Sequence, residues 1–162
     1  MNVVLVRVDD RFIHGQILES WIPHLAAQGV VVANDELACD QIQKTIMSMA
    51  IPDRIRLRIV SIDDARLLSE DCLLDHSRTL VIVSSIKDAH RLFEKGFTFG
   101  RLNIGNNKSG PNARQVSYSV WMDDDDLRLV HELMDHGVEI TLQSVPRERG
   151  IDMKTIMDMV KT

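Results

Sequence analysis

The residues best suited to chemistry in this sequence surround one histidine, His14. It follows the apolar segment Val3–Val8 and precedes a helical pattern, so it falls where a strand passes into a helix. Asp9, Asp10 and Arg11 come just before it, which crowds two carboxylates, a guanidinium and an imidazole into one turn. Ligands of open α/β sheets bind in turns of this kind. The sequence therefore predicts a site centred on His14.

These residue types favour capture of a phosphoryl group or another anion. The unperturbed pKa of histidine is about 6.5, so a neutral, nucleophilic imidazole is well populated at neutral pH. Arg11 supplies a permanent positive charge, and Gly15 removes a side chain from the path of the anion. The amides of Gly15 and Gln16 open the predicted helix and can bind an anion. Asp9 or Asp10 can accept the second ring N–H of the imidazole and so fix its tautomer.

Each of these residues also has an ordinary structural interpretation. A lone histidine after a strand is usually a hydrogen-bonded loop residue, and Asp9 and Asp10 are suited to capping the helix that follows. Arg11 can form a surface ion pair that contributes little to stability. Because all of these residues occur together, we assign the chemistry to His14 with Arg11 and Asp10, and we place Asp9 among the residues around the phosphate.

The composition is typical of one soluble domain spanning residues 1–162. The chain is 44% hydrophobic and 27% charged, and its length suits a sizeable core. The formal net charge of −5 disfavours a nucleic-acid-binding protein, because such domains are usually basic. No apolar run approaches the ~20 residues that span a bilayer, and no signal peptide opens the chain. We expect a cytoplasmic protein.

Neither the cysteines nor the histidines form a metal-binding pattern. Cys39 and Cys72 belong to no Cys-x-x-Cys pair, so we expect free thiols. His131 and His136 do not have the spacing that places two ligands on one helical face. The acidic run 123–126 is typical of a helix N-terminus, since carboxylates suit that end of the helix dipole. The sequence predicts neither a metal nor a cofactor.

Strand-like apolar runs alternate with helical patterns along the whole chain. The predicted strands are Val3–Val8, Val30–Ala33, Ile55–Val60, Leu80–Ser84, Leu102–Ile104, Val116–Trp121 and Val138–Gln143. The predicted helices are Gly15–Ala27, Asp35–Ala50, Ile62–Leu68, Ile86–Lys95, Asp123–His136 and Asp152–Val160. The early strands are continuously apolar, as in strands buried on both faces. The alternation predicts an α/β fold, an open, mainly parallel twisted sheet with helices on both faces.

Local capping and turn signals support these boundaries. Glycines fall where helices should end, at Gly29, Gly96 and Gly137. Asn34 can cap the second helix. Residues 105–113 are rich in Gly, Asn, Ser and Pro, which predicts a long, mobile loop. The segment 116–120 alternates apolar and polar side chains, which predicts a place near a sheet edge.

The run from Arg7 to Gln16 resembles the start of the mannose/sorbose-family enzyme IIB of the bacterial sugar phosphotransferase system. That family opens with an Arg-Ile-Asp-Asp-Arg-Leu-Ile-His-Gly-Gln pattern, and Val8 and Phe12 are apolar replacements within it here. Further collinear matches are Val32-Ala33-Asn34-Asp35-Glu36, Leu102-Asn103-Ile104-Gly105-Asn106 and Gln143-Ser144-Val145-Pro146. Because the matches extend over nearly the whole chain, the sequence is identified as a member of this family.

The resemblance implies a seven-stranded sheet with the strand order 3-2-4-1-5-6-7. In that order the first strand lies between the fourth and the fifth, which brings Ser84 and Gly105 around the His14 loop. We also place Asn34 near the site, although it suits a helix cap equally well, as Ser84 suits the end of a strand.

The resemblance also implies the activity and the partners. The family histidine that corresponds to His14 accepts a phosphoryl group on Nδ1 from a histidine of enzyme IIA. The group then passes to a sugar bound by the membrane components IIC and IID, so the chain meets the membrane only through partners. The implied activity is that of a protein–phosphohistidine–sugar phosphotransferase with no nucleic-acid partner. The sugar and the oligomeric state, including a homo-oligomer, stay open.

One loop departs from the family pattern. After Asn-x-Gly-Asn the family often has an apolar residue and then a histidine, whereas this chain has Asn107 and Lys108. Lys108 can meet a phosphate as a point charge, or it can be a solvated loop lysine. The departure leaves the chemistry of His14 intact but puts sugar preference and docking details in doubt.

Two other functions stand as alternatives. A regulatory phosphohistidine module without a sugar transporter would have the same residues, so the chain does not separate it from a transport component. A nucleotide-binding α/β domain is disfavoured, because the sequence lacks both Gly-x-Gly-x-x-Gly and Gly-x4-Gly-Lys-Ser/Thr.

Overall fold

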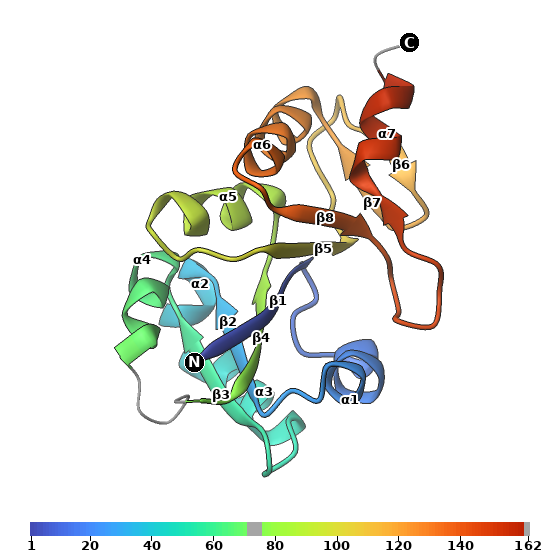
Figure 1. Ribbon diagram of the computed structural model, residues 1–162. Coiled ribbons are helices and arrows are strands. Elements are labelled where there is room, and N and C mark those ends of the chain that lie inside the picture. The colour runs from blue at the N-terminus through green and yellow to red at the C-terminus, as the bar shows by residue number, and fades with distance from the viewer. Residues whose placement is uncertain (71–75, 161–162) are drawn as a thin grey trace.

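Residues 1–70 and 76–160 are described by the computed structural model, and their strands form a seven-stranded sheet and a separate hairpin (Figure 1). The strands are β1 (Asn2–Asp9), β2 (Gly29–Ala33), β3 (Arg56–Val60), β4 (Arg78–Val83), β5 (Arg101–Asn106), β6 (Arg114–Ser117), β7 (Val120–Met122), β8 (Glu139–Leu142) and β9 (Ile151–Asp152). The large sheet has the order β3-β2-β4-β1-β5-β8-β9. Its neighbouring strands are parallel except for β8 and β9, which are antiparallel. The predicted α/β class and mainly parallel sheet are confirmed.

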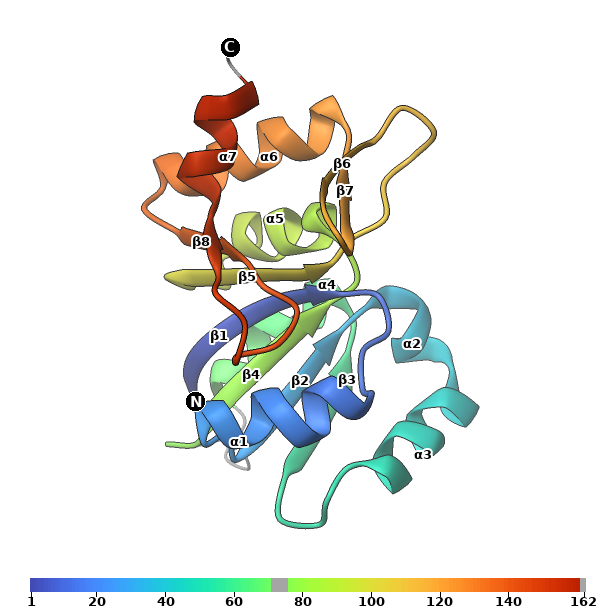
Figure 2. The same cartoon turned by 90° about the vertical axis from the view of Figure 1, so that its right-hand side faces the viewer.

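Helices cover both faces of this sheet (Figure 2). They are α1 (Ile22–Leu25), α2 (Asp35–Cys39), α3 (Gln41–Ala50), α4 (Ile62–Ala65), α5 (Ile86–Glu94), α6 (Asp124–Asp135) and α7 (Met153–Val160). The strands supply both apolar clusters with alternate side chains. Val30 and Val32 of β2 pack in the cluster that contains α1, and Val31 and Ala33 pack in the cluster that contains α5 and α6. This double burial explains why the early strands are continuously apolar.

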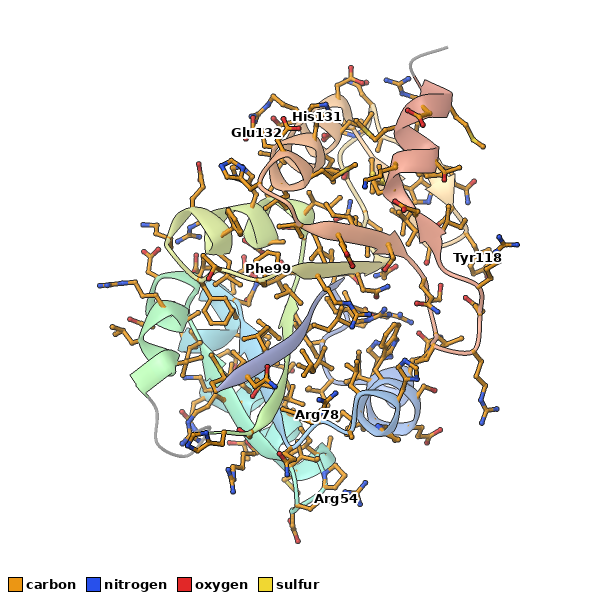
Figure 3. All side chains as sticks on the ribbon, in the orientation of Figure 1. Arg54, Arg78, Phe99, Tyr118, His131 and Glu132 are labelled. Atoms are coloured by element: carbon orange, nitrogen blue, oxygen red, sulfur yellow. The ribbon has the colours of Figure 1, made fainter. Side chains whose placement is uncertain are left out.

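One predicted strand, Val116–Trp121, does not belong to the main sheet. It contributes instead to two short strands, β6 and β7, which pair antiparallel with each other. The turn between them exposes 94% of Tyr118 (Figure 3). Because this hairpin leaves the sheet, β8 pairs with β5 and the unpredicted strand β9 takes the edge. The order 3-2-4-1-5-6-7 therefore holds for the strands of the sheet counted along the chain, with β8 and β9 as the last two.

Three of the predicted helices are not uniform. The segment Ile62–Leu68 is α4 followed by a 3-10 helix, Arg66–Glu70. The segment Asp35–Ala50 is divided at Asp40, whose extended backbone ends α2 and whose side chain accepts the Gln43 N–H at 2.9 Å to begin α3. The helix after His14 contains a π-helical stretch, Ile17–Trp21, ahead of α1. Ala26 then ends α1 in the left-handed conformation, with φ 47°, in place of the glycine predicted there.

The other helix ends follow the sequence signals. Asp123 accepts the Asp126 N–H at 2.8 Å, and the Asp126 carboxylate accepts the Asp123 N–H in return, so the acidic run forms a capping box at the start of α6. Gly96 and Gly137 come just after α5 and α6 with φ angles of 90° and 85°. Glycine adopts this conformation readily, which suits it to end a helix.

The fold places the His14 loop at the carboxyl ends of the central strands. β1 pairs with β4 on one side and with β5 on the other, as the resemblance implies. The loop of residues 10–14 leaves β1 at this edge and leads directly into the helical segment that precedes α1. Among residues 1–70 and 76–160, no helix has the length and apolar character needed to cross a bilayer.

Candidate functional site

Asp9, the last residue of β1, is the centre of a buried polar cluster. Its side chain has no solvent exposure. Oδ2 accepts hydrogen bonds from Nη2 of Arg7 at 2.9 Å and from Nε2 of His14 at 3.0 Å. Oδ1 accepts a third from Nε of Arg11 at 3.0 Å. One carboxylate thus joins His14 to two guanidinium groups.

The bond to Asp9 determines which ring nitrogen of His14 is free. A carboxylate only accepts hydrogen bonds, so Nε2 carries the proton that His14 donates to Oδ2. In the neutral imidazole the lone pair then lies on the other nitrogen, Nδ1. The His14 side chain is 18% exposed, which leaves part of the ring open to an incoming group.

Asp9 stays ionised despite its burial. Burial raises the pKa of the carboxyl, but hydrogen bonds from His14 and Arg11 and the charge of Arg7 outweigh it and hold the pKa well below its usual value. Burial lowers the pKa of Arg7 against the attraction of Asp9, and a guanidinium nevertheless keeps its proton in proteins. Arg7 and Asp9 therefore form a buried ion pair, and Asp9 acts as an acceptor at neutral pH.

Arg7 is the main residue that the sequence analysis missed. Its side chain is fully buried in β1. Nη1 donates to the carbonyl of Gln143 at 3.0 Å and to the side chain of Asn103, and Nη2 donates to the carbonyl of Ser144 at 3.1 Å. A charge inside an apolar strand needs a buried partner, and Asp9, two residues on, faces the same side of the strand. This spacing could have identified Arg7 from the sequence.

Gly105 lies in a strand, where the absence of a side chain makes room for Arg7. It lies within β5, so the loop predicted for residues 105–113 begins later. A Cβ atom on Gly105 would lie 2.0 Å from Cζ of Arg7, far inside van der Waals contact. The guanidinium can pass β5 only because no side chain is present there. The predicted start of the loop at Gly105 is therefore wrong, and a place for Gly105 beside the phosphate stays a prediction.

Gly105→Ala is therefore expected to destabilise the protein by at least about 3 kcal/mol, the upper part of the range for overpacked cores. The added methyl meets a guanidinium that is bound on both terminal nitrogens, so neither group can shift cheaply. Urea unfolding followed by circular dichroism measures the change. Gly110→Ala is the matched control, because a Cβ there meets nothing within 4 Å. Equal midpoints for the two variants would contradict the steric explanation.

Arg11 reaches Asp9 from the solvent side. Its Nη2 donates to Oδ2 of Asp9 at 3.2 Å and to Oε1 of Gln16 at 3.1 Å. The side chain is 45% exposed, in contrast to the buried Arg7. The charge of Arg11 is therefore accessible to an anion that approaches His14.

The helix begins directly after His14. The carbonyl oxygen of His14 accepts from the amides of Ile17 and Leu18 at 2.9 and 3.0 Å. The amides of Gly15 and Gln16 lie in the first turn, where N–H groups have no acceptor within the helix. A Cβ on Gly15 would meet nothing within 4 Å, so packing does not require a glycine there. The space around Gly15 is open, as expected for the approach of an anion.

In the part of the chain that the structure describes, Asp10 forms no hydrogen bond with His14. Its carboxylate accepts from the side-chain amide of Asn106, on β5. Asp10 instead lines an adjoining cleft of about 570 Å³. Of the two carboxylates that the sequence left open for the second ring N–H of His14, the geometry therefore favours Asp9, and a catalytic role for Asp10 stays a prediction.

Asn34 and Ser84 line the same cleft as Asp10. Asn34 caps α2 by accepting the Leu37 N–H at 2.9 Å, and its amide donates to Oγ of Ser84 at 3.4 Å. Ser84 donates in turn to the carboxylate of Asp88. Both residues thus lie beside the site, at the ends of β2 and β4, and their bonds are those of caps and strand ends.

Lys108 lies in another part of the surface. It is exposed and lines a cavity of about 170 Å³ with residues that begin α5 and α6, including Ser85 and Asp123. The preceding residue, Asn107, is buried and donates to the carbonyl of Trp121 at 2.8 Å, which directs the loop toward β7. In the described part of the chain, no hydrogen bond or ion pair connects Lys108 to the His14 cluster.

No group of three or more metal-ligating side chains is found among the residues that the structure describes. Cys39 is a free, exposed thiol. Cys72, also predicted to be free, lies outside the described residues.

A family model for the sorbose-subfamily IIB component of the phosphotransferase system matches residues 3–162. The chain belongs to this family. It is 30% identical over 157 residues to the fructose-specific EIIB component of Bacillus subtilis (strain 168). The aligned residues make up 97% of this chain and 96% of the relative. The crystal structure of an N-acetylgalactosamine IIB component from Streptococcus pyogenes has a TM-score of 0.87 and 27% identity, covering 96% of this chain and 97% of that one.

A third relative is a longer protein. The mannose-specific EIIAB component of Escherichia coli (strain K12) is 24% identical over 160 residues, which are 99% of this chain and 50% of the relative. Family membership makes this IIB chain a phosphocarrier in a sugar phosphotransferase system, and hence a phosphotransferase, as the sequence analysis predicts.

Proposed function

We propose that this IIB protein carries its phosphoryl group on Nδ1 of His14. The bond from Nε2–H to Asp9 carries the proposal, because it leaves the lone pair on Nδ1 for attack on phosphorus. Transfer breaks the N–P bond of the donor histidine and forms an N–P bond to Nδ1, and the electron pair of the broken bond returns to the donor nitrogen. The positive charge that develops on the His14 ring is balanced by the adjacent Asp9 carboxylate.

In this proposal Arg11 and the first helical turn hold the phosphoryl oxygens. Phosphoryl transfer depends mostly on positioning and charge stabilisation. Arg11 is exposed enough to contact the oxygens while its Nε stays on Asp9. The amides of Gly15 and Gln16 lie in the first helical turn, a position that suits an anion, and the space around the Cα of Gly15 is open.

We propose that the donor is a phosphohistidine of an enzyme IIA and that the acceptor is a sugar held by IIC and IID membrane components. The name of the E. coli mannose-specific relative joins A and B components in one chain, which supports a IIA donor. A chain that meets the membrane only through such partners works in the cytoplasm. The relatives are named for different sugars, so the proposal does not extend to the sugar.

The test is incubation with phosphoenolpyruvate, enzyme I, HPr and a family IIA, followed by intact-mass analysis and NMR of the histidine ring. The expected product has one acid-labile phosphate, bonded to Nδ1 of His14. A phosphate on Nε2 would contradict the tautomer argument. Absence of any bound phosphate would contradict the proposal that enzyme IIA is the donor.

Arg11→Ala is expected to slow phosphorylation about a hundredfold, since loss of a comparable stabilising contact costs ~3 kcal/mol. The melting temperature should stay near that of the wild type, because Asp9 keeps its buried ion pair with Arg7 and the Arg11 side chain is partly exposed. Rapid-quench measurement of the transfer rate checks this result. Arg114→Ala removes another exposed arginine, paired with Asp124, and serves as the control. Equal rates for the two variants would reduce Arg11 to a surface residue.

A further inference from the structure

We infer that Arg7 is a positioning residue for phosphoryl transfer, which fixes the Asp9 carboxylate against His14 and joins it to the loop between β8 and β9. The inference rests on the proposed role of His14. Arg7 itself is fully buried, and within the described residues no hydrogen bond joins it to the imidazole. It acts through Asp9, whose Oδ2 it shares with His14.

Arg7 is better placed than Arg11 to fix the carboxylate. Arg11 lies near the surface, and its side chain can move toward an incoming anion. Arg7 is fully buried and donates from both terminal nitrogens, to the Asn103 side chain and the Gln143 carbonyl on one side and to Asp9 and the Ser144 carbonyl on the other. When Nη2 of Arg11 moves from Oδ2 of Asp9 to a phosphoryl oxygen, the bond from Arg7 keeps Oδ2 directed at Nε2 of His14.

The same guanidinium connects the site to a distant loop. The carbonyl of Ser144 accepts from Arg7 and also from Nε1 of Trp21, at 3.0 Å. The guanidinium lies 4.8 Å from the centroid of the Trp21 ring. Arg7 therefore holds together β1, the helical segment after His14 and the start of the loop after β8, three segments that are separate in sequence (Figure 2).

Stability alone does not account for an arginine at this place. A buried ion pair is often no more stabilising than apolar side chains of similar volume. Here the fold also gives up a side chain on β5, since a Cβ on Gly105 would overlap the guanidinium. Positioning of Asp9 explains both features, because an apolar residue could not hold the carboxylate.

Arg7→Lys tests the inference, because it keeps the charge and removes the fork of donors. NMR of the unphosphorylated protein reports the His14 Nε2–H proton and the ring nitrogens. The wild type should show a slowly exchanging proton on Nε2. In Arg7→Lys that signal should broaden, and phosphoryl transfer should slow about a hundredfold, the effect expected of a misplacement near 1 Å. The KM for the donor protein should change little.

Asn103→Leu is the second variant, since it keeps the ion pair and removes an acceptor of Arg7. It should give a milder loss of the same signal and a smaller slowing, and it decides the question if Arg7→Lys does not fold. Arg114→Lys, at an exposed ion pair, is the control. A wild-type Nε2–H signal and transfer rate in the folded Arg7 or Asn103 variant would overturn the inference. Failure of the wild type to be phosphorylated would instead overturn the proposed function, while the NMR result would still report on Arg7.

Discussion

Replacing His14 with alanine is expected to abolish phosphorylation of this protein. After incubation with phosphoenolpyruvate, enzyme I, HPr and IIA, the wild type should gain one acid-labile phosphate by intact mass and the variant none. The other histidines with described contacts lack a buried carboxylate shared with arginines. His90 pairs with Glu132 and Glu94, and His131 pairs with Asp135.

His131→Ala is the matched control for this experiment. His131 lies on α6, and its side chain is 49% exposed and pairs with a single carboxylate (Figure 3). This variant should accept phosphate at the wild-type rate. Phosphorylation of the His14→Ala protein would show that another residue carries the phosphoryl group, whatever the result for His131→Ala.

The sheet could be predicted from local patterns because each central strand is buried on both faces. Every position of a run such as Val30–Ala33 is buried. A continuously apolar run of this kind is typical of a strand that is covered on both faces of a parallel sheet. The segment Val116–Trp121 has alternating side chains, which suit an edge strand and a free hairpin equally well. The two differ only in the partner strand, and that pairing depends on contacts far along the chain. The division of the second predicted helix at Asp40 could have been predicted, because Asp is a favoured N-cap residue. A single capping residue is weak evidence, however, against a helical pattern that continues on both sides of it.

The site was predicted in outline and not in its geometry. His14 and Arg11 came directly from the sequence run, and the period of a strand could have separated Asp9 from Asp10. Arg7 and Asp9 are two residues apart and share a face of β1, whereas Asp10 falls beyond the strand. The other contacts of Arg7 had no local signal, because Ser144 lies 137 positions away in sequence. A glycine whose purpose is to leave space for that arginine cannot be recognised before the contact is known.

Asp9→Asn is expected to slow phosphoryl transfer by about ten-thousandfold, the effect of the corresponding change beside the histidine of a serine protease. Both oxygens of Asp9 accept from donors, so an amide nitrogen in either position meets another N–H group. The Nε2–H tautomer of His14 then loses its acceptor. The variant also leaves Arg7 without its counter-charge, which costs about 3–5 kcal/mol for a buried pair. Transfer is therefore measured by rapid quench at a temperature where circular dichroism shows a folded protein.

Asp10→Asn is the matched control for this experiment, because it makes the same replacement of a carboxylate by an amide at the neighbouring residue. Asp10 is itself exposed and accepts from the side-chain amide of Asn106, outside the Asp9 cluster. Its variant should transfer phosphate within a fewfold of the wild type and should melt near the wild-type temperature. If Asp10→Asn were the slow variant and Asp9→Asn the active one, the loop would have to rearrange before transfer, and the bond between Asp9 and Nε2 would not define the reacting tautomer. A large loss of transfer rate in Asp9→Asn alone would show that transfer depends on the carboxylate at the end of β1. The two substitutions make the same change in charge and chemistry and differ only in position.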